Sequence, residues 1–169
     1  MKQIILIILS ILALAGCHTS KIATNLSAEK REKFVADSIK YEAVKEAFTK
    51  CEFVFKINQD GKVKVNPLDN WMIFSTGKVR YQYSYNNTQP PRSYAGEIRD
   101  LKQISDSKKK TITLIGNVIA HFPFRMTLYE GSDKAYGYIG GYGDTLCEGW
   151  IEPLNDATIV RGWESPIYK

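Results

Sequence analysis

Thr111-Ile112-Thr113-Leu114-Ile115-Gly116-Asn117-Val118 is a β-branched, apolar run, and Phe122, Phe124, Met126 and Leu128 follow it at every second position. A period of two is typical of a β-strand that buries one of its faces. The pattern therefore predicts two strands here, and several other segments of the chain have a similar strand-like composition.

Other segments with strand-like composition occur between the helix-forming region and residue 151. They are residues 52–57, 63–65, 71–74, 79–85, 94–104, 135–139 and 147–151. Short turn signals such as Asp60-Gly61 separate them. Because no helical segment lies between strands, a parallel α/β fold is excluded. About eight strands in a meander predict an antiparallel sheet that curls into a half-barrel or sandwich.

Residues 28–50 are the helical segment that precedes these strands. Ser27 is a good N-cap, and Glu29 places negative charge in the first turn. The apolar residues at helical spacing are Val35, Ile39, Ala43 and Ala47, with Phe34, Tyr41, Val44 and Phe48 widening the stripe. We expect this face to cover the sheet rather than to contact a membrane. The fold class is α+β, in one domain over residues 27–169.

The chain begins with a short leader. Lys2 is followed by an apolar run over residues 4–15, which is too short to span a bilayer and has the layout of a secretory signal. Leu14-Ala15-Gly16-Cys17 resembles the bacterial lipobox. The resemblance implies a signal peptide over residues 1–16, lipid on Cys17 and a tether over residues 17–26.

The lipid bilayer is the first partner that this leader implies. His18 follows the cysteine where the sorting pattern retains aspartate at the inner membrane, so we expect the outer membrane, facing the periplasm. The formal charge of +5 is scattered except at Lys108-Lys109-Lys110, which we expect to be a solvated turn. The sequence has no basic stripe with interleaved aromatic residues, so we expect no nucleic-acid partner.

Cys51 and Cys147 are the cysteines that remain after the leader. In an oxidising compartment they form either a disulfide or two separate buried thiols. The chain has two histidines, His18 and His121, so a histidine-rich metal site is excluded and no metal or cofactor is expected. His121 could activate Cys147 as a nucleophile, but we expect His121 to have a structural role instead.

Two acids and several aromatic residues remain as candidate site residues. Glu148 and Glu152 share a strand face and are the best pair for a carboxylate-dependent hydrolase, although solvent exposure is the simpler expectation. The candidate ligand-binding aromatics are Tyr81, Tyr83 and Tyr85 on one strand face, Tyr136 and Tyr138 on another, and Trp150. The alternative is that these rings form the core.

Several segments resemble a family of exported bacterial proteins, the domain of unknown function 4251 (DUF4251). They are Ala43-Val44, Phe53-Val54-Phe55, Tyr94-Ala95-Gly96-Glu97-Ile98, Phe122 through Leu128, the step from Gly131 to Ala135, and Cys147-Glu148-Gly149-Trp150-Ile151. The resemblance covers residues 44–151. It implies a helix-plus-sheet lipoprotein domain of Gram-negative gut-type bacteria and brings no catalytic residue.

We therefore expect a non-enzymatic, periplasm-facing lipoprotein that binds a ligand or partner protein at the cell envelope. One alternative is a carrier of apolar molecules inside a curled sheet, which needs an internal cavity. The other is the envelope glycan hydrolase, which needs two acids facing one cleft.

Overall fold

The computed structural model describes residues 28–84, 92–118, 122–139 and 146–157. Its contacts divide the chain into two units, residues 1–38 and 39–169, and helix α3 (Ala28–Lys50) begins in the first and ends in the second. The helix has the bounds that the sequence predicted. The predicted signal peptide, Cys17 and the tether lie outside the described residues. Within the described ranges, no helix is both long and apolar enough to cross a bilayer.

Nine strands follow α3 in the described part of the chain. They are β1 (Phe53–Asp60), β2 (Val63–Lys64), β3 (Trp71–Ser75), β4 (Lys78–Tyr83), β5 (Arg92–Asp106), β6 (Thr111–Val118), β7 (Phe122–Tyr129), β8 (Lys134–Ile139) and β9 (Leu146–Pro153). Every pairing is antiparallel. The predicted strand segments are therefore confirmed within a few residues at each end.

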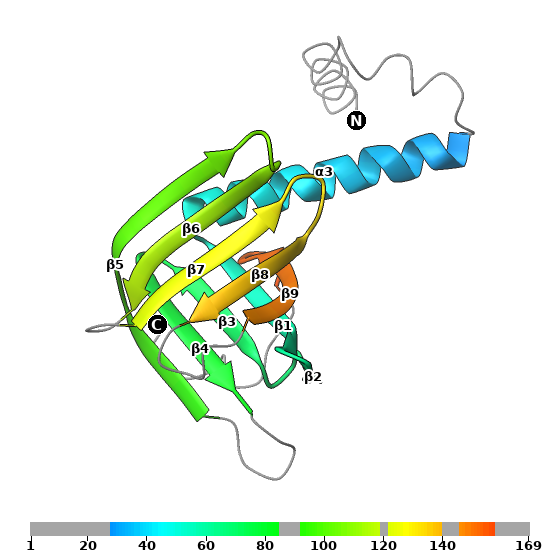
Figure 1. The fold of residues 1–169 in the computed structure, drawn as a ribbon. Helices are drawn as coiled ribbons and strands as arrows, with labels where there is room; N and C mark the ends of the chain where they lie inside the picture. The colour runs from blue at the N-terminus through cyan, green and yellow to red at the C-terminus, as the bar shows by residue number, and fades with distance from the viewer. Residues whose placement is uncertain (1–27, 85–91, 119–121, 140–145, 158–169) are drawn as a thin grey trace. The chain divides into compact units, whose positions relative to one another are not determined.

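The sheet closes on itself. Strand β1 pairs with β3 on one side and with β9 on the other, so eight strands form a closed barrel, and the short β2 is an extra strand beside the end of β1 (Figure 1). The expectation of a half-barrel or sandwich is wrong, although α+β holds. Closure pairs the two edge strands of the sheet and so satisfies their backbone hydrogen-bonding groups. A local sequence pattern does not predict this pairing.

Gly149 is the residue that lets β9 approach β1. It lies opposite Ile57, and a Cβ atom at this position would come within 1.9 Å of the carbonyl oxygen of Lys56. The ring of Phe55 occupies the space inside the barrel, 2.9 Å from that hypothetical atom and 3.0 Å from one at Gly137. Gly149 thus allows β9 to pair closely with β1, and Gly137 and Gly149 together leave space for the ring of Phe55 inside the barrel.

The interior is a continuous aromatic and aliphatic core. Phe48 of α3 packs on Phe53 with a ring separation of 5.0 Å, Phe53 stacks on Phe74 at 4.6 Å, and Phe74 meets Phe124 at 5.5 Å. Other fully buried members are Phe55, Leu114, Met126, Leu128 and Ile151. Strands from around the barrel therefore share one core, as their period of two predicted.

The apolar stripe of α3 is buried only in its last turns. Val44, Ala47 and Phe48 are buried, whereas Phe34 is 55% exposed and Ile39 is 64% exposed. The expectation that the whole stripe covers the sheet is therefore wrong at Ile39. Helical spacing marks a face of a helix, but burial also requires a packing partner opposite each turn.

We expect Gly149→Ala to lower the free energy of unfolding by about 3 kcal/mol, because the methyl group must displace the β1 backbone. Urea denaturation followed by circular dichroism measures this loss. Gly131→Asn is the matched control, since Gly131 has φ +75° with nothing within 4 Å and asparagine tolerates that conformation. Equal losses in the two variants would contradict the assigned role of Gly149.

Candidate functional site: the distal rim of the barrel

One end of the barrel gathers side chains that combine aromatic rings with a carboxylate. Strands β1, β4, β6 and β8 end there, and β5, β7 and β9 begin there; Val44, Ala47 and Phe48 of α3 pack into the core near the other end. Five residues at this end lie on the inner face of their strands, and we call them the distal rim. They are Asp60, Tyr83, Tyr94, Phe122 and Cys147.

Asp60 is the polar centre of the distal rim. The hydroxyl of Tyr83 donates a hydrogen bond to Asp60 Oδ2 at 2.7 Å, and the thiol of Cys147 donates to Asp60 Oδ1 at 3.8 Å. Simple alternation from Ile57 would turn Asp60 outward. The register of β1 against β9 shifts between Ile57 and Gln59, and this bulge brings Asp60 to the inward side.

Further aromatic rings lie at the same end of the barrel. Tyr81 stacks on Tyr94 with a ring separation of 5.1 Å and an interplanar angle of 19°. Tyr94 and Phe122 sit at inward positions yet are 38% and 42% exposed, since they lie where their strands begin. Apolar rings beside a fixed polar group are the usual composition of a ligand site, with the rings giving contact area and the polar group giving orientation.

The two cysteines are free thiols in the structure. Cys147 pairs in register with Asp60 at the end of β1, whereas Cys51 precedes the start of the same strand. The length of β1 separates them by about 20 Å, and a disulfide needs Cα atoms within about 7 Å. The alternative of two separate thiols therefore describes this structure, and the bridge is not made.

Neither thiol has the electrostatics of a nucleophile. Burial, and then the negative charge and hydrogen bonding of Asp60, raise the pKa of Cys147 to about 12. Burial, followed by the charge of Glu52, raises the pKa of Cys51 to about 11. A catalytic cysteine needs a lowered pKa, because the thiolate is the reactive form.

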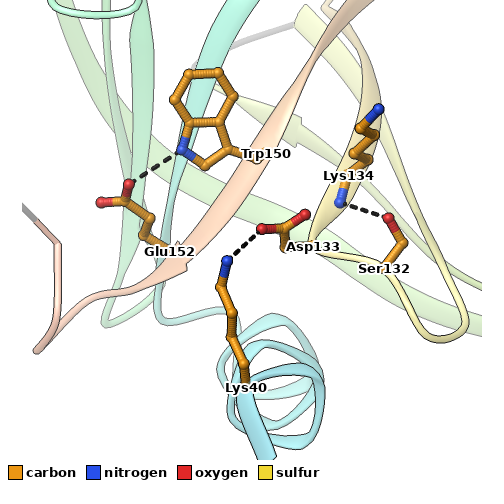
Figure 2. Close-up of polar contacts among 6 residues, drawn as sticks. All are labelled: Lys40, Ser132, Asp133, Lys134, Trp150 and Glu152. Atoms are coloured by element: carbon orange, nitrogen blue, oxygen red, sulfur yellow. Dashed lines mark hydrogen bonds and ion pairs between the residues drawn. The ribbon is translucent and has the colours of Figure 1, made fainter. Parts of the chain in front are cut away.

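The second group of predicted aromatics lies on the outside of the barrel. Tyr136, Tyr138 and Trp150 alternate with the inward residues of β8 and β9, so they face away from the core. Figure 2 shows Trp150 on β9 with its indole nitrogen donating to Glu152 Oε1 at 3.1 Å. Lys56 Nζ lies 2.8 Å from the other oxygen of Glu152. The buried Lys56 therefore positions the carboxylate of Glu152, and this carboxylate positions the ring of Trp150.

A neighbouring ion pair joins α3 to the β7–β8 turn. Lys40 Nζ lies 2.7 Å from Asp133 Oδ2, and Ser132 in the same turn accepts a bond from the backbone of Lys134 (Figure 2). Lys40 is largely exposed, so this pair contributes at most about 1 kcal/mol to stability. Its effect is to orient the turn.

The paired acids share a face, as predicted, but they are far apart. Glu148 and Glu152 both point outward from β9, and four residues of strand separate them by about 13 Å. Glycoside hydrolysis requires about 5–10 Å between the two carboxyl groups. Glu152 is in addition engaged by Lys56 and Trp150.

Two predicted residues, Tyr85 and His121, lie outside the described residues. Within the described ranges, no three histidine, cysteine or acidic side chains lie close enough together to hold a metal ion. Sequence reasoning read Asp60 only as part of a turn and gave no role to Tyr94 or Phe122. All three residues lie at the ends of strands. This position in the sequence could have indicated them, because the rim of a barrel is formed by residues at strand ends.

The chain is similar in fold to a solved structure. No protein-family model matches the chain, and no curated protein does. The crystal structure of a DUF4251 family protein from Bacteroides eggerthii matches with a TM-score of 0.60 and 20% identity, covering 73% of this chain and 94% of that chain. The resemblance to DUF4251 is thereby confirmed at the level of the fold.

We expect stability to fall in alkali through Cys147. Its pKa rises from 9.0 to about 12 on folding, so its contribution is complete below pH 9 and is lost as pH rises toward 12. Urea denaturation at neutral pH and at about pH 10 should show a smaller loss for Cys147→Ser than for the unaltered protein. An identical loss in both proteins would contradict this assignment.

Proposed function

We propose that the protein is a non-enzymatic binding module of the cell envelope, acylated at Cys17, held at the outer membrane and facing the periplasm. The leader supports the anchor and its location. The observation that carries the binding role is the distal rim, where Tyr94 and Phe122 are partly exposed at the same end of the barrel as the hydrogen-bonded Asp60. The occupant is a ligand or partner protein that covers the exposed rings of Tyr94 and Phe122.

Binding fits this site better than catalysis does. Both thiols are held in their protonated form, and Asp60 already accepts bonds from Tyr83 and Cys147. A general base needs a free lone pair close to the proton that it removes. The rim residues instead stabilise one another, which is suited to presenting a fixed surface.

The distal rim also fits better than an internal carrier cavity. A carrier of apolar molecules needs space within the barrel, and an eight-stranded barrel is just wide enough for side chains or one small ligand. Here Phe55 fills the space over Gly137 and Gly149, and Phe124 lies 2.7 Å from a Cβ atom placed at Gly116. The described interior is packed with the protein's own side chains.

We expect labelled palmitate to enter the unaltered protein and not Cys17→Ala, which should leave the membrane fraction. Fractionation of Gram-negative cells that express each version, followed by autoradiography, measures both effects. Equal membrane association without any label would contradict the anchor.

We expect Tyr94→Ser combined with Phe122→Ser to remove the ligand or partner. The lipidated protein is used for affinity capture from envelope extracts, and bound proteins and small molecules are quantified by mass spectrometry. Ile104→Ser is the matched control, because Ile104 is 49% exposed on the outside of β5. A species retained by the control and reduced about tenfold by the rim variant, or about 1.4 kcal/mol, supports the site. Capture that is the same from both variants would overturn it.

A further inference from the structure

Aromatic rings and two opposite charges gather on the outside of β7, β8 and β9. In the antiparallel register, Lys134 lies opposite Trp150 and Tyr136 lies opposite Glu148. Tyr129 contacts Tyr136 from the neighbouring strand, with ring centres 5.5 Å apart and an interplanar angle of 77°. Each of these five residues is adjacent in sequence to a residue that packs inside the barrel, so its side chain points outward. We call the five residues the outer corner.

The rings of the outer corner are held in place by their neighbours. Trp150 donates its indole N–H to Glu152 at 3.1 Å, and Lys56 fixes that carboxylate from 2.8 Å. Figure 2 shows the indole of Trp150 in this hydrogen bond. Tyr136 meets Tyr129 edge to face, which is a preferred geometry for two aromatic rings. Rings that are fixed before binding lose little conformational entropy when a ligand stacks on them.

The outer corner is open to solvent and its charges are available to a ligand. Tyr129 is 45% exposed, Lys134 is exposed, and Tyr136, Glu148 and Trp150 are partly exposed. Among the residues that the structure describes, neither the ammonium group of Lys134 nor the carboxylate of Glu148 has an ion-pair partner. A ligand on the rings would therefore meet one hydrogen-bond donor and one acceptor.

This combination of groups selects a ligand rich in hydroxyl groups. A hydroxyl group can accept a hydrogen bond from Lys134 and donate one to Glu148. An acyl chain would desolvate both charges without compensation, and an anion held by Lys134 would be repelled by Glu148. A neutral sugar satisfies both charges with its hydroxyl groups, and its C–H face stacks on an aromatic ring. The charges and the rings are thus complementary to the same ligand.

We propose that the outer corner is a saccharide-binding site and that its ligand is a neutral, β-1,4-linked glycan. The equatorial substituents of such a chain leave flat C–H faces exposed, which suit the rings of Trp150 and Tyr136. The site crosses β7, β8 and β9, a width of about 10 Å, so consecutive sugar units contact different strands. The outer corner is separate from the distal rim, and the proposal does not depend on the rim or on the anchor.

The first experiment titrates the full chain with cellohexaose and with chitohexaose, using saturation-transfer NMR and calorimetry. We expect the strongest transfer at the C–H protons of the stacked faces. Tyr136→Ala and Trp150→Ala should each weaken binding about tenfold, whereas Trp150→Phe, which keeps a ring, should weaken it less. Ile104→Ala is the matched control, since Ile104 is exposed on the outside of β5, and its affinity should equal that of the unaltered protein.

The second experiment removes the charges and leaves the rings in place, so it does not depend on how well Trp150→Ala folds. We expect Lys134→Met and Glu148→Gln each to weaken saccharide binding several-fold, with unchanged circular dichroism. Binding by the unaltered protein should change little between low and high salt, because the ligand is neutral.

Three results would overturn the proposal. They are absence of binding to both saccharides, equal binding of the α-linked maltohexaose, and affinities that none of the outer-corner variants changes. Loss of saccharide binding in the distal-rim variant alone would also overturn it, since the glycan would then occupy the rim. A partner protein captured by the unaltered chain and lost only in Tyr136→Ala, with neither saccharide bound, would assign the outer corner to that protein instead.

Discussion

The close approach of Gly149 to the β1 backbone is the contact on which the structure depends. A side chain there would collide with the carbonyl oxygen of Lys56, so the seam between β1 and β9 exists because position 149 carries only hydrogen. Opening this seam would leave two unpaired strand edges, each with a row of unsatisfied backbone groups. Glycine costs conformational entropy in a strand, and closure of the barrel offsets that cost.

Closure gives the molecule an inside, an outside and two ends with different properties. Phe55 fills the interior over Gly137 and Gly149, so the barrel is a packed core. The last turns of α3 add Val44, Ala47 and Phe48 to that core. The distal rim has no equivalent described element, and there aromatic rings at inward positions are partly exposed.

The same seam carries a buried charge on the outer surface of the barrel. Lys56 is 5% exposed although it faces outward, and its ammonium group is paired with Glu152 of the neighbouring strand. A buried ammonium group without a carboxylate would be strongly unfavourable, so the pair fixes which residues face each other across β1 and β9. Glu152 in turn fixes the indole of Trp150. Of the two acids that suggested catalysis, Glu152 thus has structural partners at the seam.

The local structure of this protein follows from the order of its residues alone. Period-two alternation located the strands, helix-forming residues located Ala28–Lys50, and the absence of helices between strands excluded a parallel fold. These features depend on neighbours within a few residues, which a linear pattern contains. Closure of the sheet, the inward position of Asp60 and the burial of Lys56 and Trp71 depend instead on contacts between strands that are far apart in the chain. Closure requires β1 to meet β9 some ninety residues later, and the bulge after Ile57 reverses the alternation that a sequence pattern assumes. The two tyrosine groups lie on different sides of the sheet for the same reason, since inside and outside are defined only once the barrel is closed.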